Sequence, residues 1–189
     1  MEEVQYFPSG ILEFSENEVF VDAGAFDGDT IEIFVEKTKD RGYKKIYAFE
    51  PDNTNYSKLA KRKIMNLEIH NKGIYSCNSI LKFIDNMGGS SKLDNGGEVE
   101  VEVVSLDEMN LKDLPTFIKM DIEGSELEAL KGAKEIIKNN KPKLAICIYH
   151  KLEGLWEIPL FVKELVPEYK FYIRNYTSNF GEIVLYATV

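Results

Sequence analysis

The segment from Val19 to Thr30 constrains the fold of this chain more than any other part of its sequence. It reads Val-Phe-Val-Asp-Ala-Gly-Ala-Phe-Asp-Gly-Asp-Thr, a short apolar run followed by an acid and two glycines. Such an apolar run is typical of a strand that is buried on both faces of a parallel sheet. The helical pattern of Ile31, Phe34 and Val35 follows directly. Strand, glycine turn and helix together predict the crevice in which open α/β sheets bind nucleotides, where glycine lets the backbone pass close to a ligand.

Strand and helix patterns alternate along most of the 189 residues, which predicts an α/β fold with a mainly parallel sheet. No repeat or linker divides the chain, so we expect one domain over 1–189 with a short lead-in over 1–18. The expected strands are 19–22, 45–49, 67–73, 117–121, 143–149, 169–175 and 182–188, and the expected helices are 29–41, 53–65, 125–138 and 156–166. Two more strands, 80–84 and 99–104, flank a segment rich in Gly, Asn and Ser at 85–97, which predicts a β-hairpin-like insertion with a mobile loop.

A second acid narrows the class of ligand. Glu50 follows the buried run 45–49 and precedes Pro51, at the tip of the second strand, where an acid accepts hydrogen bonds from ribose hydroxyls. The glycine turn, however, places Phe26 and Asp27 where a diphosphate needs bare amides and no negative charge. The acids of this region instead suit a ligand with an ammonium and a sulfonium group, as in S-adenosylmethionine. These acids are Asp22, Asp27, Asp29 and Glu50.

Five sequence blocks resemble the FkbM-type methyltransferases, in the order found in that family: residues 21–30, 48–52, 105–108, 118–126 and 149–151. The block Ile-Lys-Met-Asp-Ile-Glu-Gly-Ser-Glu at 118–126 is the most distinctive. The resemblance implies a Rossmann-like class I methyltransferase fold, with a mainly parallel seven-stranded sheet, helices on both faces and an antiparallel C-terminal hairpin. It also implies S-adenosylmethionine as the donor and, usually, O-methylation of a hydroxyl on a sugar or other small molecule.

Members of that family commonly carry a longer N-terminal region, whereas 18 residues precede Val19 here. This departure indicates either that a lid or acceptor-recognition segment is absent or that the chain is part of a longer protein. The family motifs and the strand ends together predict the cofactor-binding residues, which are Asp22, Gly24, Ala25, Phe26, Asp27, Gly28, Thr30, Glu50, Pro51, Gly73 and Asp121.

Methyl transfer to a hydroxyl needs a base, because a free alcohol is a poor nucleophile and proton removal accelerates such reactions by about 10²–10⁴-fold. His150 is the first candidate, since it directly follows the buried strand at 143–149 and an ordinary histidine has a pKa near 6.5. Asp121 and Glu123, at the tip of the strand at 117–121, are the second candidates for catalysis. We interpret Glu126 as a carboxylate that a helix N-terminus favours, and His70 as structural.

Three alternatives stay open on the sequence alone. Asp121, Glu123 and His150 are also possible ligands of Mg²⁺, but nothing in their spacing requires a metal, and we expect none. A binding module that holds S-adenosylmethionine without turnover is the second alternative. An NAD-linked oxidoreductase is the third; the turn at 26–27 and the absence of a catalytic Tyr-X-X-X-Lys pair disfavour it.

Composition limits the acceptor and the compartment. A net charge of −9 with three arginines disfavours nucleic acid, so we expect a small-molecule or saccharide acceptor. The densest basic run, at 58–63, is interpreted as the solvated face of a helix. No apolar stretch approaches the ~20 residues that span a bilayer, and the acidic start does not match a signal peptide. Two solitary cysteines, Cys77 and Cys147, favour a reducing compartment, and we expect the cytoplasm.

Overall fold

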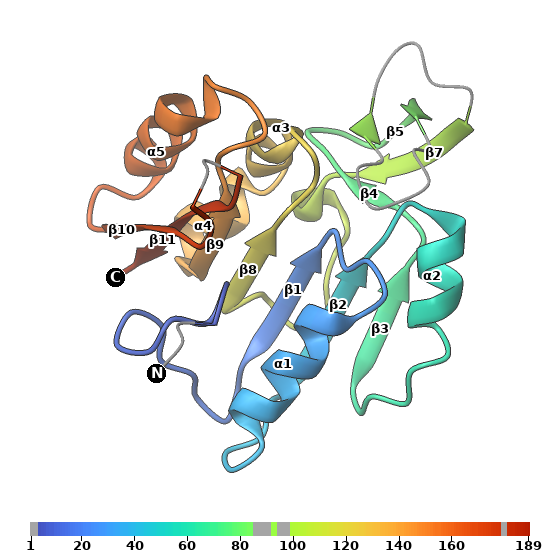
Figure 1. Cartoon of the computed structure of the whole chain (residues 1–189), viewed down its shortest axis with the longest axis horizontal. Coiled ribbons are helices and arrows are strands. Elements are labelled where there is room, and N and C mark those ends of the chain that lie inside the picture. Colours follow the sequence, from blue (N-terminus) through green and yellow to red (C-terminus); the bar gives the residue numbers. More distant parts are fainter. Residues whose placement is uncertain (1–3, 85–91, 94–98, 179–180) are drawn as a thin grey trace.

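The computed structural model describes residues 4–84, 92–93, 99–178 and 181–189. A seven-stranded sheet in the order β10-β11-β9-β8-β1-β2-β3 forms its centre (Figure 1). Its strands are β1 (Val19–Ala23), β2 (Lys45–Phe49), β3 (Leu67–His70), β8 (Phe117–Met120), β9 (Lys143–Cys147), β10 (Lys170–Asn175) and β11 (Ile183–Thr188). β1, β2, β3, β8 and β9 are parallel, whereas β11 runs antiparallel to both β9 and β10. The predicted α/β fold with a C-terminal antiparallel pair is therefore confirmed.

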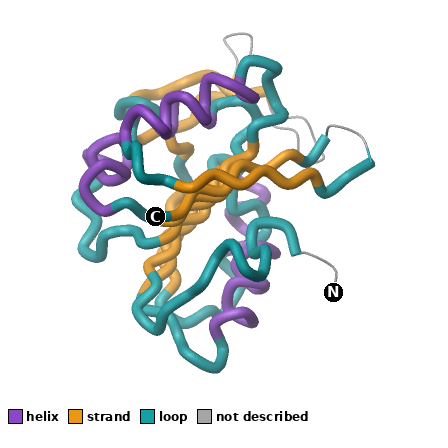
Figure 2. Tube along the Cα trace, turned by 90° about the vertical axis from the view of Figure 1, so that its left-hand side faces the viewer, coloured by secondary structure: helices purple, strands orange, loops and turns teal. Residues whose placement is uncertain are grey.

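Helices cover both faces of this sheet (Figure 2). They are α1 (Asp29–Thr38), α2 (Asn53–Leu59), α3 (Glu126–Lys131), α4 (Lys134–Asn140) and α5 (Gly154–Leu165). Alternate residues of β1 serve opposite faces, as the pleat of a strand requires. Val19 and Val21 pack in one buried cluster with residues of α3, α4 and α5, whereas Phe20 packs in the other with α1. The Phe20 ring stacks on Phe117 with centroids 4.9 Å apart, which joins β1 to β8 through side chains as well as through the ladder.

The predicted helix over 125–138 is wrong in its continuity, because Gly132 and Ala133 separate α3 from α4. A β-carbon on Gly132 would lie 2.0 Å from the carbonyl oxygen of Tyr75, so only glycine fits. A short 3₁₀ helix, η1 (Leu106–Glu108), precedes β8 in the chain and lies at this break between α3 and α4. Both carboxylate oxygens of Asp107 accept hydrogen bonds, at 3.0 Å each, from the backbone N–H groups of Glu135 and Ile136, so this side chain satisfies the first turn of α4.

The basic run at 58–63 does not lie on a continuous helix, since α2 ends at Leu59 rather than at residue 65. Arg62 lies beyond that end and folds back to the glycine turn. Its guanidinium donates to the carbonyl oxygen of Asp27, lies 3.2 Å from the Asp27 carboxylate, and pairs with Glu32 on α1. The prediction of a purely solvated basic face is therefore wrong for Arg62, which ties the end of α2 to the turn.

The predicted strand over 67–73 divides between two sheets. β3 ends at His70, and β4 (Gly73–Ile74) belongs to a second sheet in the order β4-β7-β5-β6. This sheet also contains β5 (Ser79–Ile84), β6 (Lys92–Leu93) and β7 (Val99–Val104). β5 and β7 pair antiparallel, as the hairpin-like prediction required, although β4 and β6 extend them. Apart from Lys92 and Leu93, the loop predicted at 85–97 lies outside the described residues.

The lead-in before β1 packs against the molecule rather than away from it. Tyr6, Phe7 and Leu12 are buried in the cluster that contains Phe20 and Phe34. Among the described helices, none has the length and apolar character that crossing a membrane requires.

Candidate active site

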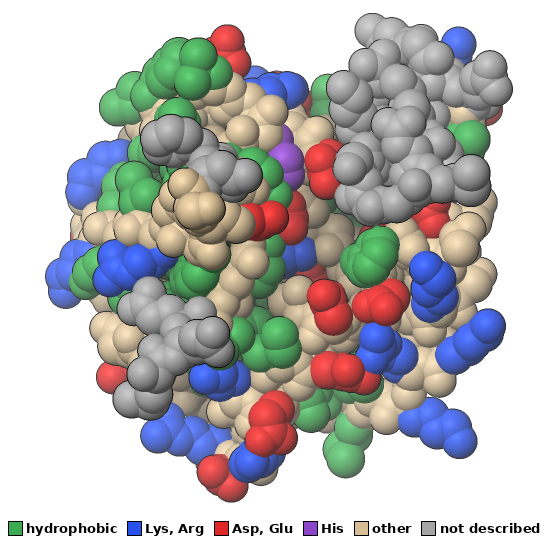
Figure 3. Space-filling model, in the orientation of Figure 1, with side chains coloured by type: hydrophobic (Ala, Val, Ile, Leu, Met, Phe, Trp, Pro, Cys, Tyr) green, Lys and Arg blue, Asp and Glu red, His purple; other side chains and the backbone are tan. Residues whose placement is uncertain are grey.

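A cavity of about 340 Å³ opens where β1, β2 and β8 end, the edge at which open α/β sheets bind ligands. Figure 3 shows acidic side chains around the hollow at the centre of this face. Eight predicted site residues line it: Gly24, Phe26, Thr30, Glu50, Pro51, Gly73, Asp121 and Glu123. The predicted residues that do not line it are Asp22, Ala25, Asp27, Gly28 and His150.

Gly24 forms the floor of the turn after β1. Its φ is +79°, and a β-carbon there would lie 1.9 Å from the carbonyl oxygen of Asp121. The N–H groups of Gly24 and Ala25 both donate to the carbonyl oxygen of Phe49 at 3.0 Å. The turn is therefore held against the ends of β2 and β8 at once, and only glycine permits this approach.

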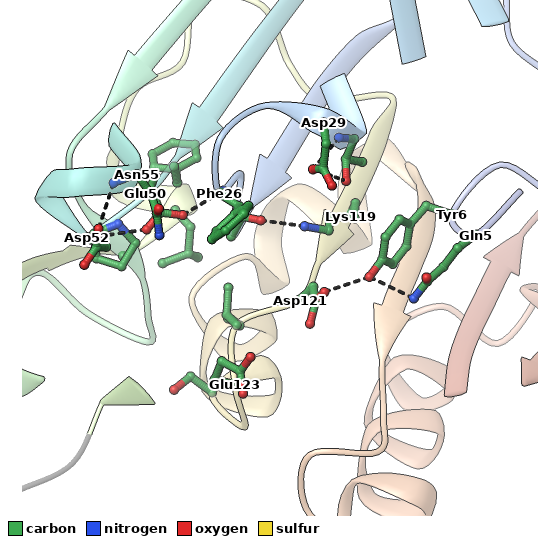
Figure 4. Close-up of a pocket in the computed structure, with 18 of the residues that line it drawn as sticks. Gln5, Tyr6, Phe26, Asp29, Glu50, Asp52, Asn55, Lys119, Asp121 and Glu123 are labelled. Atoms are coloured by element: carbon green, nitrogen blue, oxygen red, sulfur yellow. Dashed lines mark hydrogen bonds between the residues drawn. The ribbon is translucent and has the colours of Figure 1, made fainter. Parts of the chain in front are cut away.

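Asp22 does not face the cavity but pairs beneath it with Lys119. Both side chains are buried, and Lys119 Nζ lies 2.9 Å from Asp22 Oδ1. Lys119 Nζ also donates to the Gly24 carbonyl oxygen at 2.7 Å (Figure 4). Burial alone would lower the pKa of Lys119, but the carboxylates of Asp22 and Asp121 outweigh it and raise that pKa, so the ammonium stays charged. Lys119 thus provides a fixed positive charge under the glycine turn.

Glu50 lines the cavity at the end of β2. Its Oε2 accepts the N–H of Phe26 at 2.7 Å and its Oε1 accepts the N–H of Asp52 at 2.9 Å (Figure 4). Burial raises the pKa of Glu50 to about 7, against the lowering effect of these two hydrogen bonds. Each oxygen keeps a second lone pair, so the carboxylate can still accept hydrogen bonds from a ligand in the cavity.

Tyr6 and Gln5 bring the lead-in to the opposite wall of the cavity. The Tyr6 hydroxyl donates to Asp121 Oδ2 at 2.7 Å (Figure 4), and the Tyr6 ring lies 5.2 Å from Lys119 Nζ. Burial raises the pKa of Tyr6, and the neighbouring Cys147 and Asp121 raise it further, so the hydroxyl stays a donor. Tyr6 has a φ of 68°, which few non-glycine residues adopt.

His150 lies behind Asp121 and Glu123. Its side chain is 8% exposed, and its Nε2 is 3.4 Å from Asp121 Oδ1 and 3.7 Å from Glu123 Oε2. This buried Nε2 has no hydrogen-bond partner within the described part of the chain. Burial would lower the pKa of His150, but the hydrogen bond and charge of Glu126, together with Asp121 and Glu123, raise it. His150, the first candidate base, therefore does not line the cavity itself but contacts Asp121 and Glu123, which do.

One group of side chains could accommodate a metal ion. Ligand atoms of Asp121, Glu126 and His150 all lie within 4.8 Å of one another. The Oε1 of Glu126, however, already accepts the N–H of Ile122 at 2.9 Å and lies 2.7 Å from His150 Nδ1. A metal at this oxygen would compete with the bonds that hold the turn, so the absence of a metal remains our prediction.

Among the cavity-lining residues that the sequence did not predict are Lys119, Tyr6, Gln5 and Glu182. Lys119 had a signal, since it stands inside an apolar strand, where an unpaired ammonium is costly. Tyr6, Gln5 and Glu182 had none, because they reach the cavity from the two ends of the chain; Gln5 Nε2 donates to Glu182 Oε2 at 2.7 Å. Glu126 lies in the first turn of α3, as we interpreted it, and its Oε1 also lies 2.7 Å from His150 Nδ1.

Comparison with known proteins identifies the family and the fold. The model of the Methyltransferase FkbM domain matches residues 22–183. The structure of an FkbM methyltransferase from Methylobacillus flagellatus KT is similar, with 31% identity and a TM-score of 0.80, over 97% of this chain and 46% of that one. This chain therefore spans about half the length of that protein.

More distant structures share the fold alone. The SMU.1697c protein of Streptococcus mutans in complex with SAH has 15% identity and a TM-score of 0.54, over 93% of this chain and 90% of that one. A chain of the fibrillarin/Nop5p complex has 17% identity and a TM-score of 0.61, over 95% and 76%. No curated protein matches the chain. The match over residues 22–183, with the similarity to the Methylobacillus structure, shows that the chain belongs to the FkbM methyltransferase family.

Proposed function

We propose that this protein is an S-adenosylmethionine-dependent O-methyltransferase that acts on a hydroxyl of a small molecule or saccharide. The observation that carries the proposal is a cavity lined by Glu50 at the end of β2 and by Asp121 and Glu123 after β8, with His150, from the chain after β9, in contact with these two acids. The first suits a ribose diol and the second suits proton transfer. The Streptococcus mutans protein, which shares the fold, was solved in complex with SAH, and this supports the choice of cofactor.

The residues that would hold S-adenosylmethionine fit its chemistry. Glu50 offers acceptors to the ribose hydroxyls, and Gly24 lines the same cavity, where we place the methionine portion. Asp29 and Asp121 line the same cavity and suit the ammonium and sulfonium charges. When bound, the cofactor supplies an activated methyl group on sulfur.

The chain's own contribution is alignment and proton removal. With S-adenosylmethionine bound, the cofactor would supply the methyl group, and the acceptor hydroxyl would have to lose its proton as it gains that methyl group. The hydroxyl proton passes to Asp121, which lines the cavity, and is shared with His150 behind it, before it leaves to solvent. His150 is thus proposed as the proton-accepting partner of Asp121, with Glu123 beside the same nitrogen.

An alternative candidate, binding of the cofactor without turnover, is kept because the chain spans about half of the Methylobacillus protein. A thermal-shift series with S-adenosylmethionine, SAH and NAD tests the binding step. A ligand at 100 times its Kd should raise the Tm by about 5–10 °C, and NAD should not. Transfer of a labelled methyl group to small molecules of a cell extract, followed by mass spectrometry, then separates an enzyme from a binding module.

His150→Ala and a chelator test the catalytic assignment. The variant should bind SAH like the wild type and lose about 10²–10⁴-fold of its methyl transfer rate. Wild-type turnover in that variant would transfer the role to Asp121 or Glu123. Treatment with chelator should leave the rate unchanged, and a loss that Mg²⁺ restores would instead make these residues metal ligands.

A further inference from the structure

Glu126 is a buried carboxylate that the proposed reaction does not itself use. Its Oε1 accepts the N–H of Ile122 at 2.9 Å and the N–H of Gly124 at 3.3 Å, and it lies 2.7 Å from His150 Nδ1. A carboxyl oxygen that already accepts two backbone N–H groups acts as an acceptor toward a third partner as well. The hydrogen between Glu126 and His150 therefore belongs to the imidazole.

We propose that Glu126 is a positioning residue that holds neutral His150 as the Nδ1–H tautomer, which leaves Nε2 as the proton acceptor behind Asp121. This inference rests on the proposed function above. The other tautomer would set two acceptors, Nδ1 and the Glu126 oxygen, against each other at 2.7 Å. It would also place a hydrogen on Nε2, the nitrogen that lies 3.4 Å from Asp121 Oδ1.

The arrangement around Nε2 favours uptake of one proton. Nε2 is buried and has no hydrogen-bond partner in the described part of the chain, while carboxylates of Asp121 and Glu123 lie 3.4 and 3.7 Å away. Without a proton, three acceptors converge with no donor between them. A proton that Asp121 receives from the acceptor hydroxyl can move to Nε2, and the Glu126 charge then stabilises the imidazolium.

Glu126 also fixes where this imidazole lies. Its bonds to Ile122 and Gly124 hold the turn between β8 and α3, and Gly124 has a φ of +91° in that turn. The Oε1 atom of Glu126 therefore links the turn that contains Glu123 to His150, in the chain after β9. The same side chain sets the ring orientation and its tautomer, as a second-layer carboxylate does for catalytic histidines.

The tautomer is measured directly by long-range ¹H–¹⁵N correlation spectra of the wild-type protein. The chain has two histidines, so His70→Gln assigns the signals of His150 without ambiguity. Above its pKa, His150 should show a protonated Nδ1 and an unprotonated Nε2. The opposite tautomer in the wild type overturns the proposal, whether or not methyl transfer is ever detected.

Glu126→Gln is the matching variant, since it keeps an oxygen for the backbone bonds and removes the charge. The pKa of His150, read from the same spectra, should fall, and the acid limb of the pH–rate profile should move to lower pH with it. The plateau rate should drop about tenfold or more, because His150 would then be a weaker base and would populate both tautomers.

Glu128→Gln is the control. Glu128 stands in the same first turn of α3 and pairs with Lys131 at 2.5 Å, so its charge is lost without contact to His150. This variant should keep the wild-type tautomer, pKa and pH profile. An equal change in both variants, or an unmoved His150 pKa in Glu126→Gln, would show that Glu126 acts only on the fold. If the spectra show the proposed tautomer but no methyl transfer is detected, the proposed methyltransferase function is wrong, while the role of Glu126 in positioning His150 is supported.

Discussion

At the scale of single residues, the four charged members of the distinctive block at 118–126 have separate physical roles. Lys119 holds the glycine turn from below, and Asp121 faces the cavity with the Tyr6 hydroxyl on its second oxygen. Glu123 flanks His150 and Glu126 bonds to it. The chain leaves β8 at Met120 and turns, with positive φ at Glu123 and Gly124, before α3 begins at Glu126. This turn places Asp121 and Glu123 on the cavity and Glu126 against His150.

Gly24→Ala should destabilise the protein strongly, because the new β-carbon would lie 1.9 Å from the carbonyl oxygen of Asp121. Gly42→Ala is a matched control, since Gly42 has a φ of +83° against +79° for Gly24 but nothing within 4 Å. Backbone strain should cost about 1–2 kcal/mol in both variants, and overpacking should add about 1–3 kcal/mol or more at Gly24. Urea unfolding measures both, and equal losses would contradict the close approach.

Glu50→Gln should weaken SAH binding by at least about tenfold, since hydrogen bonds to a charged group are worth about 1.5–3 kcal/mol. Isothermal titration calorimetry gives the Kd. Glu68→Gln is the control, because Glu68 is a partly exposed acid on β3 that pairs with Lys45 away from the cavity. An unchanged Kd in folded Glu50→Gln would remove Glu50 from the cofactor site.

At the scale of elements, the lead-in before β1 forms one wall of the cavity through Gln5 and Tyr6. Phe7 anchors it, with its ring centroid 5.9 Å from that of Phe117 and 6.2 Å from that of Phe20. The anchor places Tyr6 against Asp121. The stability of this element and the shape of the cavity are therefore coupled.

Phe7→Ala should cost about 3–5 kcal/mol of unfolding free energy, as the loss of a buried aromatic ring does. It should also weaken SAH binding, because Tyr6 loses its support. Leu160→Ala, at a position 66% exposed on α5, should change neither quantity appreciably. Denaturant unfolding and calorimetry on the same samples check the coupling, and lost stability with an intact Kd would separate the lead-in from the site.

At the scale of the whole molecule, the site is built at the expense of stability, because it buries acids. Burial raises the pKa of Glu50 from 4.5 to about 7. Between these values the unfolded chain loses the proton first, so the folded state binds more protons and stability falls as pH rises. The full loss is about 3 kcal/mol as an order of magnitude. The unfolding free energy of the wild type should therefore decline relative to Glu50→Gln across this interval, and parallel curves would contradict the raised pKa.

Local patterns in the sequence were sufficient for most of the strands, for the glycine turn and for the position of Glu50 at the end of β2. An apolar run indicates a buried strand, and a glycine in a turn indicates a backbone conformation that other residues rarely adopt. Both inferences use neighbouring residues only and need no knowledge of distant partners. The same reasoning failed where a distant segment intervened. Asp107 enters the break between α3 and α4, and Asn71 leaves the sheet to donate to the Glu50 carbonyl oxygen at 2.9 Å.

The sequence by itself therefore determined the fold class, the family and the edge of the sheet where the cavity lies. Only the tertiary structure decided which side chains face that cavity. It placed His150 behind Asp121 and brought Tyr6 to Asp121 across 115 positions of the chain. The physical reason is that a hydrogen bond or an ion pair depends on distance in space, while periodicity reports only which face of an element is buried.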